Sequence, residues 1–119
     1  MRDNWYVGNA EDDRRSNRGW ILGHFIDPEK GAVRSTEALE IKWGVHPAGE
    51  QRADWVVHEQ RTTLLLLVQG RFRVDLSVGS VTLARQGDYV VWGPGIDHSW
   101  QAEEDSVVVA VRWPSLPGV

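Results

Sequence analysis

The chain contains no cysteine among its 119 residues. This absence excludes disulfides, thiolate metal sites and cysteine nucleophiles together, and a reducing compartment favours such a composition. We therefore expect a cytoplasmic protein whose fold depends on packing alone. A chain of this length can bury a sufficient hydrophobic core as one domain.

The sequence also lacks an excess of positive charge and any long apolar segment. Its formal net charge is −4, which gives no support for nucleic acid or an anionic membrane as a partner. The longest aliphatic run, residues 64–68, is far too short to cross a bilayer. Residues 1–19 lack the apolar stretch of a secretory signal. We predict that they form a polar N-terminal arm and that residues 20–119 form the folded domain.

Short apolar or alternating segments, separated by turn-forming residues, follow the arm. No long amphipathic helix is present, so the pattern predicts an all-β domain built as a sandwich or a barrel. Strands are expected at residues 20–26, 37–45, 54–59, 62–68, 71–78, 81–85, 89–92, 96–101 and 106–113. Gly79-Ser80 is expected to form a two-residue hairpin turn.

The predicted strand at residues 37–45 has two different faces. Ile41 and Trp43 belong to an apolar face, while Glu40 and Lys42 alternate with them on the other. This alternation is typical of a half-buried strand. Whether Lys42 points inward or outward stays open at this point.

The stretch from Gly87 to Trp100 organises the rest of the chain. A short apolar strand is followed by the Gly93-Pro94-Gly95 break, which cannot continue a ladder. His98 then begins the next strand, and Trp100 lies on the same face. We expect the imidazole to point into the space that the sheets enclose.

This stretch resembles the second motif of the cupin superfamily, in which a glycine, a proline, a glycine and a histidine stand at fixed spacing. Gly87, Gly95 and His98 match, and Gly93 stands at the proline position. The resemblance implies a single-domain jelly-roll β-barrel. Dimers are common in the family, so a homodimer is a possible assembly.

The first cupin motif is matched less completely. His58 falls at its second histidine and Gly70 at its glycine, but Val56 stands at the first histidine and Thr63 at the glutamate. The resemblance therefore implies that His58 and His98 are the two retained metal-ligand positions out of four. Glu59 and Asp97, each one residue from a histidine, are expected to point away from the cavity.

Strand parity predicts a cavity with aliphatic and indole walls and a few polar groups. The residues predicted to line it are Val56, His58, Thr63, Leu65, His98 and Trp100. Seven tryptophans are many for this length, and some of them are expected to line the pocket. Such a lining suits a small, partly apolar ligand.

These residues favour a small-molecule-binding cupin without a complete metal site. A working site normally needs three protein ligands, so the cofactor is expected to be either absent or a divalent iron, zinc, nickel or manganese ion held by His58 and His98. The alternative is a cupin enzyme. It would be a metal-dependent oxygenase or isomerase, or a metal-free lyase, cyclase or epimerase with His58 or His98 as the catalytic base.

Overall fold

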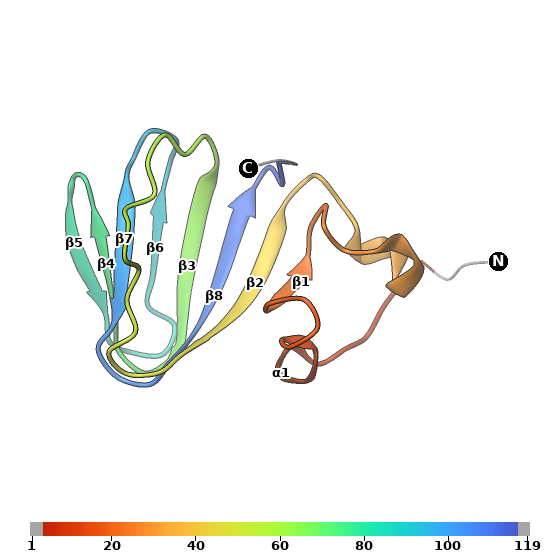
Figure 1. The fold of residues 1–119 in the computed structure, drawn as a ribbon, viewed down its shortest axis with the longest axis horizontal. Coiled ribbons are helices and arrows are strands. Elements are labelled where there is room, and N and C mark those ends of the chain that lie inside the picture. The colour runs from red at the N-terminus through yellow and green to blue at the C-terminus, as the bar shows by residue number, and fades with distance from the viewer. Residues whose placement is uncertain (1–3, 117–119) are drawn as a thin grey trace.

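The computed structural model describes residues 4–116, which form two antiparallel sheets and a small N-terminal lobe (Figure 1). The larger sheet has the order β1 (Trp20–Leu22), β2 (Glu40–His46), β8 (Ser106–Trp113), β3 (Thr62–Gln69), β6 (Tyr89–Trp92). The smaller sheet has the order β5 (Gly79–Leu83), β4 (Phe72–Leu76), β7 (His98–Ala102). The lobe contains the helix α1 (Ala10–Asp13) and the 3₁₀ turns η1 (Pro28–Lys30) and η2 (Ala32–Arg34). The predicted all-β fold is confirmed.

The hydrophobic core lies between the two sheets. Alternate residues of β3 are buried, and they pack against inward residues of β4 across the interior. The core cluster consists of Leu65, Leu67, Phe72, Val74, Leu83, Trp92, Ala102 and Val108. The inner face of β2 meets the smaller sheet at one end, where the His46 ring lies 4.5 Å from the Trp100 ring of β7, and Lys42, Gly44 and His46 line a cavity between the sheets.

Most predicted strands are present, and β6 and β8 have the predicted bounds. The hairpin turn is a correction: Leu76 pairs with Gly79, so Ser77 and Val78 form the turn and Gly79 already begins β5. Gly79 has φ +147°, a left-handed value that favours glycine at the exit of the turn rather than at its centre. The first strand is shorter than predicted because the chain leaves it at Gly23, where φ is +144°.

The structure decides which face of β2 is interior, a choice that the sequence left open. Its buried side carries Glu40 and Gly44, and Lys42 lines the interior cavity. Ile41 and Trp43 point outward. The N-terminal lobe covers part of this outward face, where the Trp43 indole N–H donates to Glu11 Oε2 at 3.0 Å. Alternation identified a two-faced strand, but polar side chains occupy the face toward the interior.

Residues 54–59 do not form the predicted strand. They make one isolated bridge, in which the backbone of Val56 exchanges hydrogen bonds of 2.8 and 3.1 Å with His98. His58 then adopts a left-handed backbone with φ +59°. This turn interrupts the alternation of side chains, so Glu59 enters the interior instead of pointing away from it.

The outward face of the larger sheet carries no charged side chain on β2, β3, β6 or β8. Tyr89 and Val91 on β6 are well exposed there. The homodimer stays a prediction, and this face is where a second copy would bury apolar surface. Within residues 4–116 no helix has the length and hydrophobicity that a bilayer crossing requires.

The predicted arm at residues 1–19 contains α1, and Asn9 caps this helix by accepting from the Asp12 N–H at 3.0 Å. At the other end of the chain Ser115 is buried, and its hydroxyl oxygen accepts from the His24 N–H at 3.1 Å. Residues 1–3 and 117–119 lie outside the described part. The division into an arm at 1–19 and a domain at 20–119 stays a prediction.

Candidate functional site

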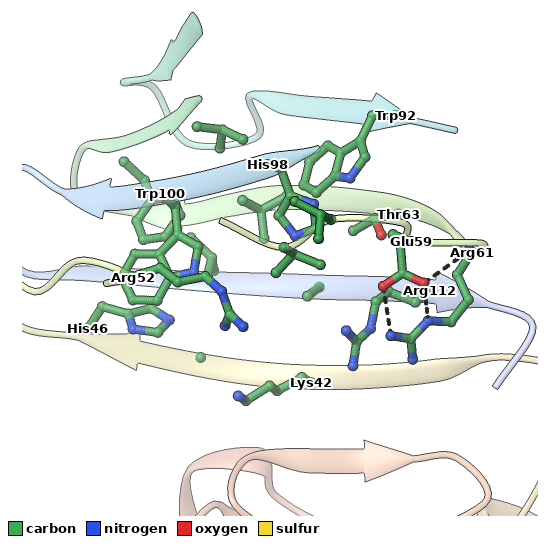
Figure 2. A pocket seen from close by; sticks show the side chains of 18 of the residues that line it. Lys42, His46, Arg52, Glu59, Arg61, Thr63, Trp92, His98, Trp100 and Arg112 are labelled. Atoms are coloured by element: carbon green, nitrogen blue, oxygen red, sulfur yellow. Dashed lines mark hydrogen bonds and ion pairs between the residues drawn. The ribbon is translucent and has the colours of Figure 1, made fainter. Parts of the chain in front are cut away.

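A cavity of about 440 Å³ lies between the sheets and extends under β2 (Figure 2). All six predicted pocket residues line it: Val56, His58, Thr63, Leu65, His98 and Trp100. Its size is within the usual range for small-molecule sites. Trp100 forms part of one wall, where its ring stacks on Phe72 with the centroids 5.2 Å apart.

The two histidines of the motifs differ in their surroundings. His98 is half-buried at the start of β7, and its ring lies 4.8 Å from the Trp92 ring. Burial, and after it the charge of Arg52, lowers the pKa of His98 below its usual 6.5, so the imidazole is neutral at pH 7. His58 is exposed on its left-handed turn. No hydrogen bond or ring contact joins the two imidazoles within the described residues.

The side chains around the cavity do not fit a cupin metal centre. Val56 and Thr63 cannot replace the missing histidine and glutamate, and the carboxylate of Glu59 is already bound by Arg61. Residues 4–116 contain no group of three His, Asp or Glu side chains that could hold a metal ion. Cationic side chains that line the same cavity would also repel a divalent cation. Ligation by His58 and His98 stays a prediction without a third ligand.

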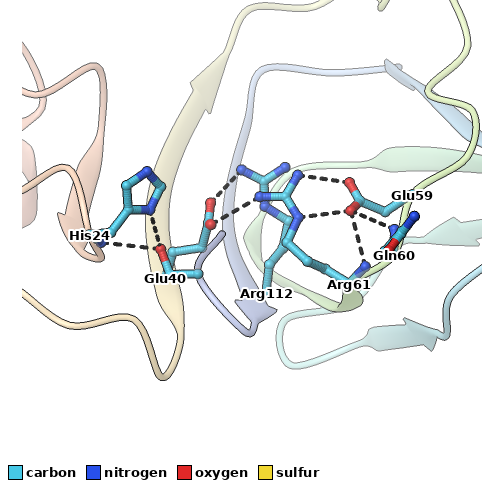
Figure 3. A network of polar contacts seen from close by, with 7 residues as sticks. His24, Glu40, Glu59, Gln60, Arg61 and Arg112 are labelled. Atoms are coloured by element: carbon cyan, nitrogen blue, oxygen red, sulfur yellow. Dashed lines mark hydrogen bonds and ion pairs between the residues drawn. The ribbon is translucent and has the colours of Figure 1, made fainter. Parts of the chain in front are cut away.

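Glu59, Arg61 and Arg112, which line the cavity, belong to an ionic network with Glu40 (Figure 3). Arg61 donates to Glu59 through Nε and Nη2, both at 2.8 Å, and to Glu40 through Nη1 at 3.0 Å. Arg112 Nη2 donates to the other Glu40 oxygen at 2.5 Å. The Glu40 side chain is fully buried, and Glu59 also accepts from the backbone N–H groups of Gln60 and Arg61. Buried charges are stable only when they are paired in this way.

Acid should weaken this network through Glu59. Hydrogen bonding by Arg61 is the largest effect on this carboxyl, and it lowers the pKa of Glu59 from 4.5 to about 2. A carboxyl group whose pKa is lower in the folded protein than in the unfolded chain stabilises the fold. This stabilisation is complete at pH values above the pKa of the unfolded chain and is lost as the pH falls through the pKa of the folded protein. We expect the free energy of unfolding to fall by about 3 kcal/mol between roughly pH 5 and pH 2.

Urea denaturation at several pH values measures this effect. In the Glu59→Gln variant the free energy of unfolding should depend much less on pH between roughly pH 5 and pH 2. The control variant Glu103→Gln, at a half-exposed ion pair with Arg71, should keep the pH dependence of the native chain. Parallel pH curves for the native chain and Glu59→Gln would contradict the assignment.

Sequence reasoning missed the charged residues of this site. It expected Glu59 to point away, left Lys42 undecided and assigned no role to Arg52, Arg61 or Arg112. One signal was available: Arg112 has the same parity on β8 as Val108 and Ala110, which line the cavity. A charge at an inward position of an apolar strand indicates a buried partner or a ligand.

Near β1, two cationic side chains that line the cavity, Arg112 and Lys42, lie over the ring of Trp20. The Arg112 guanidinium carbon lies 4.8 Å from the Trp20 ring centroid, and Lys42 Nζ lies 5.4 Å from it. Burial, and then the charges of Arg112, Arg52 and Arg18, lower the pKa of Lys42. The cavity is therefore electropositive on this side.

Beside Arg112, whose cross-strand partner on β3 is Thr63, a second part of the lining has residues with buried polar atoms that lack a partner in the described residues. They are Thr63 Oγ1, Trp92 Nε1 and His98 Nδ1. Thr63 and Trp92 face each other across β3 and β6, and the Trp92 ring contacts His98, so the three atoms belong to one region. Native proteins rarely leave such groups unpaired, so these atoms are candidates for hydrogen bonds to ordered water or to a ligand.

Several solved structures have folds similar to that of this chain. The chain resembles KdgF from a Halomonas species, with 28% identity, a TM-score of 0.59 and coverage of 66% of this chain and 72% of that one. It also resembles an RmlC-like cupin from Shewanella frigidimarina (17% identity, TM-score 0.60, 68% and 70% covered). A third is a cupin protein from Bacteroides fragilis (20% identity, TM-score 0.57, 69% and 72% covered).

No family model and no curated protein matches the sequence. The two facing sheets and these structural neighbours define a jelly-roll protein, as predicted. The chain therefore has the cupin fold.

Proposed function

We propose that this cupin binds a small molecule in the cavity between its sheets, without a resident metal. The observation that carries the proposal is the pair of unpartnered buried groups, Trp92 Nε1 and Thr63 Oγ1, beside a cavity of about 440 Å³. Leaving such a group without a partner costs about 1–3 kcal/mol, and a bound molecule removes this cost. Aliphatic and indole walls with a few polar groups are typical of small-molecule sites.

Metal content tests the second half of this proposal. Protein purified without a metal-binding tag is expected to contain far less than one equivalent of iron, zinc, nickel or manganese by elemental analysis. Adding each ion back should give no saturable change in thermal stability, in the native chain or in His98→Ala. One bound metal per chain that is lost in both His58→Ala and His98→Ala would contradict it.

A catalytic role is the second candidate, and one observation favours it. His98 is neutral at pH 7, faces the cavity and has an unpartnered Nδ1. A neutral imidazole of this kind can accept a proton from a bound molecule. His58 is a weaker candidate for the catalytic base because its side chain is exposed. Turnover that His98→Ala abolishes while leaving ligand affinity intact would establish the enzyme, and unchanged turnover would reject it.

A further inference from the structure

Two cations that line the cavity, Lys42 and Arg52, are in no ion pair within the described residues, although Glu50, which bonds to His46, lies near enough to Lys42 to favour its charged form. By contrast, Glu40 and Glu59 already neutralise Arg61 and Arg112. The Arg52 side chain makes no hydrogen bond within residues 4–116 either, although its backbone N–H donates to the Trp100 carbonyl at 3.0 Å. Figure 2 shows the Arg52 side chain extending into the space between Trp100 and Arg112.

These charges act on one another. Arg112 and Arg52 each disfavour the protonated form of Lys42, which places the three cations in one region of the cavity. Crowded like charges in a partly enclosed site raise the free energy of the empty protein. An anion bound among them would relieve this repulsion, and guanidinium groups suit carboxylate and phosphate oxygens in particular.

The wall with Thr63 and Trp92 places a different demand on the ligand. Trp92 is only 5% exposed and Thr63 only 4%. An indole nitrogen can only donate, and a threonine hydroxyl can donate as well as accept. Together with His98 they can bind hydroxyl or carbonyl oxygens. A purely hydrocarbon ligand would leave these groups unpaired.

Resting on the proposed function, we infer that the ligand is a small hydroxylated organic anion. Its carboxylate or phosphate lies among Lys42, Arg52 and Arg112, and its neutral oxygens meet the Thr63, Trp92 and His98 wall. The two regions are walls of one cavity, so a single molecule contacts both. No metal takes part in this recognition.

Matched probes test this inference. Gluconate and glucitol differ only in the carboxylate at one end, hexanoate has the carboxylate without the hydroxyls, and glucose 6-phosphate supplies the phosphate. Binding is followed by calorimetry and by tryptophan fluorescence, since Trp20, Trp92 and Trp100 line the cavity. Gluconate or glucose 6-phosphate should bind at least about tenfold more tightly than glucitol, and gluconate more tightly than hexanoate. The preferred anion shows which anionic group the site takes.

Two variants assign the effect to residues. Arg52→Gln should weaken the binding of the anions about tenfold and leave the affinity for glucitol unchanged. The Arg52 side chain makes no hydrogen bond or ion pair to another described residue, so its loss should not disturb the fold. Arg71→Gln, which removes an exposed guanidinium on the outside near Glu103, is the matched control and should change nothing. Trp92→Phe should weaken the binding of gluconate and leave that of hexanoate unaffected, because it removes the N–H and leaves a smaller aromatic ring in its place.

Two outcomes would overturn the inference, and they are distinguishable. If glucitol binds as tightly as both anions and Arg52→Gln has no effect, the cavity takes neutral molecules, and the proposed function survives. If none of the four probes binds at millimolar concentration, both the inference and the proposed function fail.

Discussion

Replacing Arg61 by methionine is expected to lower the free energy of unfolding by about 3–5 kcal/mol, the usual cost of leaving buried charges without their partner. Arg61 is 4% exposed and, within residues 4–116, is the one residue whose side chain hydrogen-bonds to both Glu59 and Glu40. After the substitution Glu40 retains Arg112, but Glu59 keeps only backbone donors. Urea denaturation followed by tryptophan fluorescence measures the loss.

The control is Arg71→Met. Arg71 pairs with Glu103 at 3.1 Å, and both side chains are about a third to a half exposed. Such a pair contributes less than about 1 kcal/mol, so this variant should be close to the native chain. The double variant Arg61→Met/Glu59→Leu should recover part of the loss, because it removes the orphaned carboxylate together with its partner. Equal destabilisation by Arg61→Met and Arg71→Met would contradict the network.

The second large effect is expected from Ala110→Phe, which should weaken binding of any cavity ligand by about 100-fold or more, equivalent to roughly 2.7 kcal/mol. Ala110 lies on the inner face of β8, opposite Lys42 on one side and Leu65 on the other, and it lines the cavity. A phenyl ring there projects into the cavity between its cross-strand neighbours Lys42 and Leu65, which also line it. Overpacking a dense core costs about 1–3 kcal/mol, but this ring enters a hollow, so stability should change little.

Ala84→Phe is the matched control because it makes the same substitution at an exposed position outside the cavity. It should leave affinity unchanged in calorimetric titrations with gluconate or glucose 6-phosphate. If Ala110→Phe binds either probe as the native chain does, the ligand lies elsewhere and the cavity is not the binding site.

Local patterns were sufficient for much of the fold. The strand β8 has a continuous apolar run bounded by an acidic turn and a proline, and β6 has a glycine boundary on each side, so both could be predicted residue by residue. Segment 54–59 has the same kind of pattern and is not a strand, because a left-handed residue at His58 breaks it. A single backbone angle of this kind is determined by tertiary contacts and leaves no clear trace in composition.

The site was predictable only in part, for a related reason. The motifs and strand parity together identified six residues that line the cavity, including His98 and Trp100. They could not identify the ionic network, because Glu40 and Arg112 are 72 residues apart along the chain and meet only through the pairing of β2 with β8. Alternation also could not decide that the polar face of β2 is the interior one, since that choice depends on the cavity itself.

A crystal structure of the free protein is the most direct test of the central claim, which is that a hollow between the sheets presents unpaired polar groups to a ligand. We predict ordered water or a copurified molecule within hydrogen-bonding distance of Trp92 Nε1 and Thr63 Oγ1, in a cavity of about 440 Å³. Side chains that fill the space between the sheets, with both groups bonded to other protein atoms, would contradict the claim.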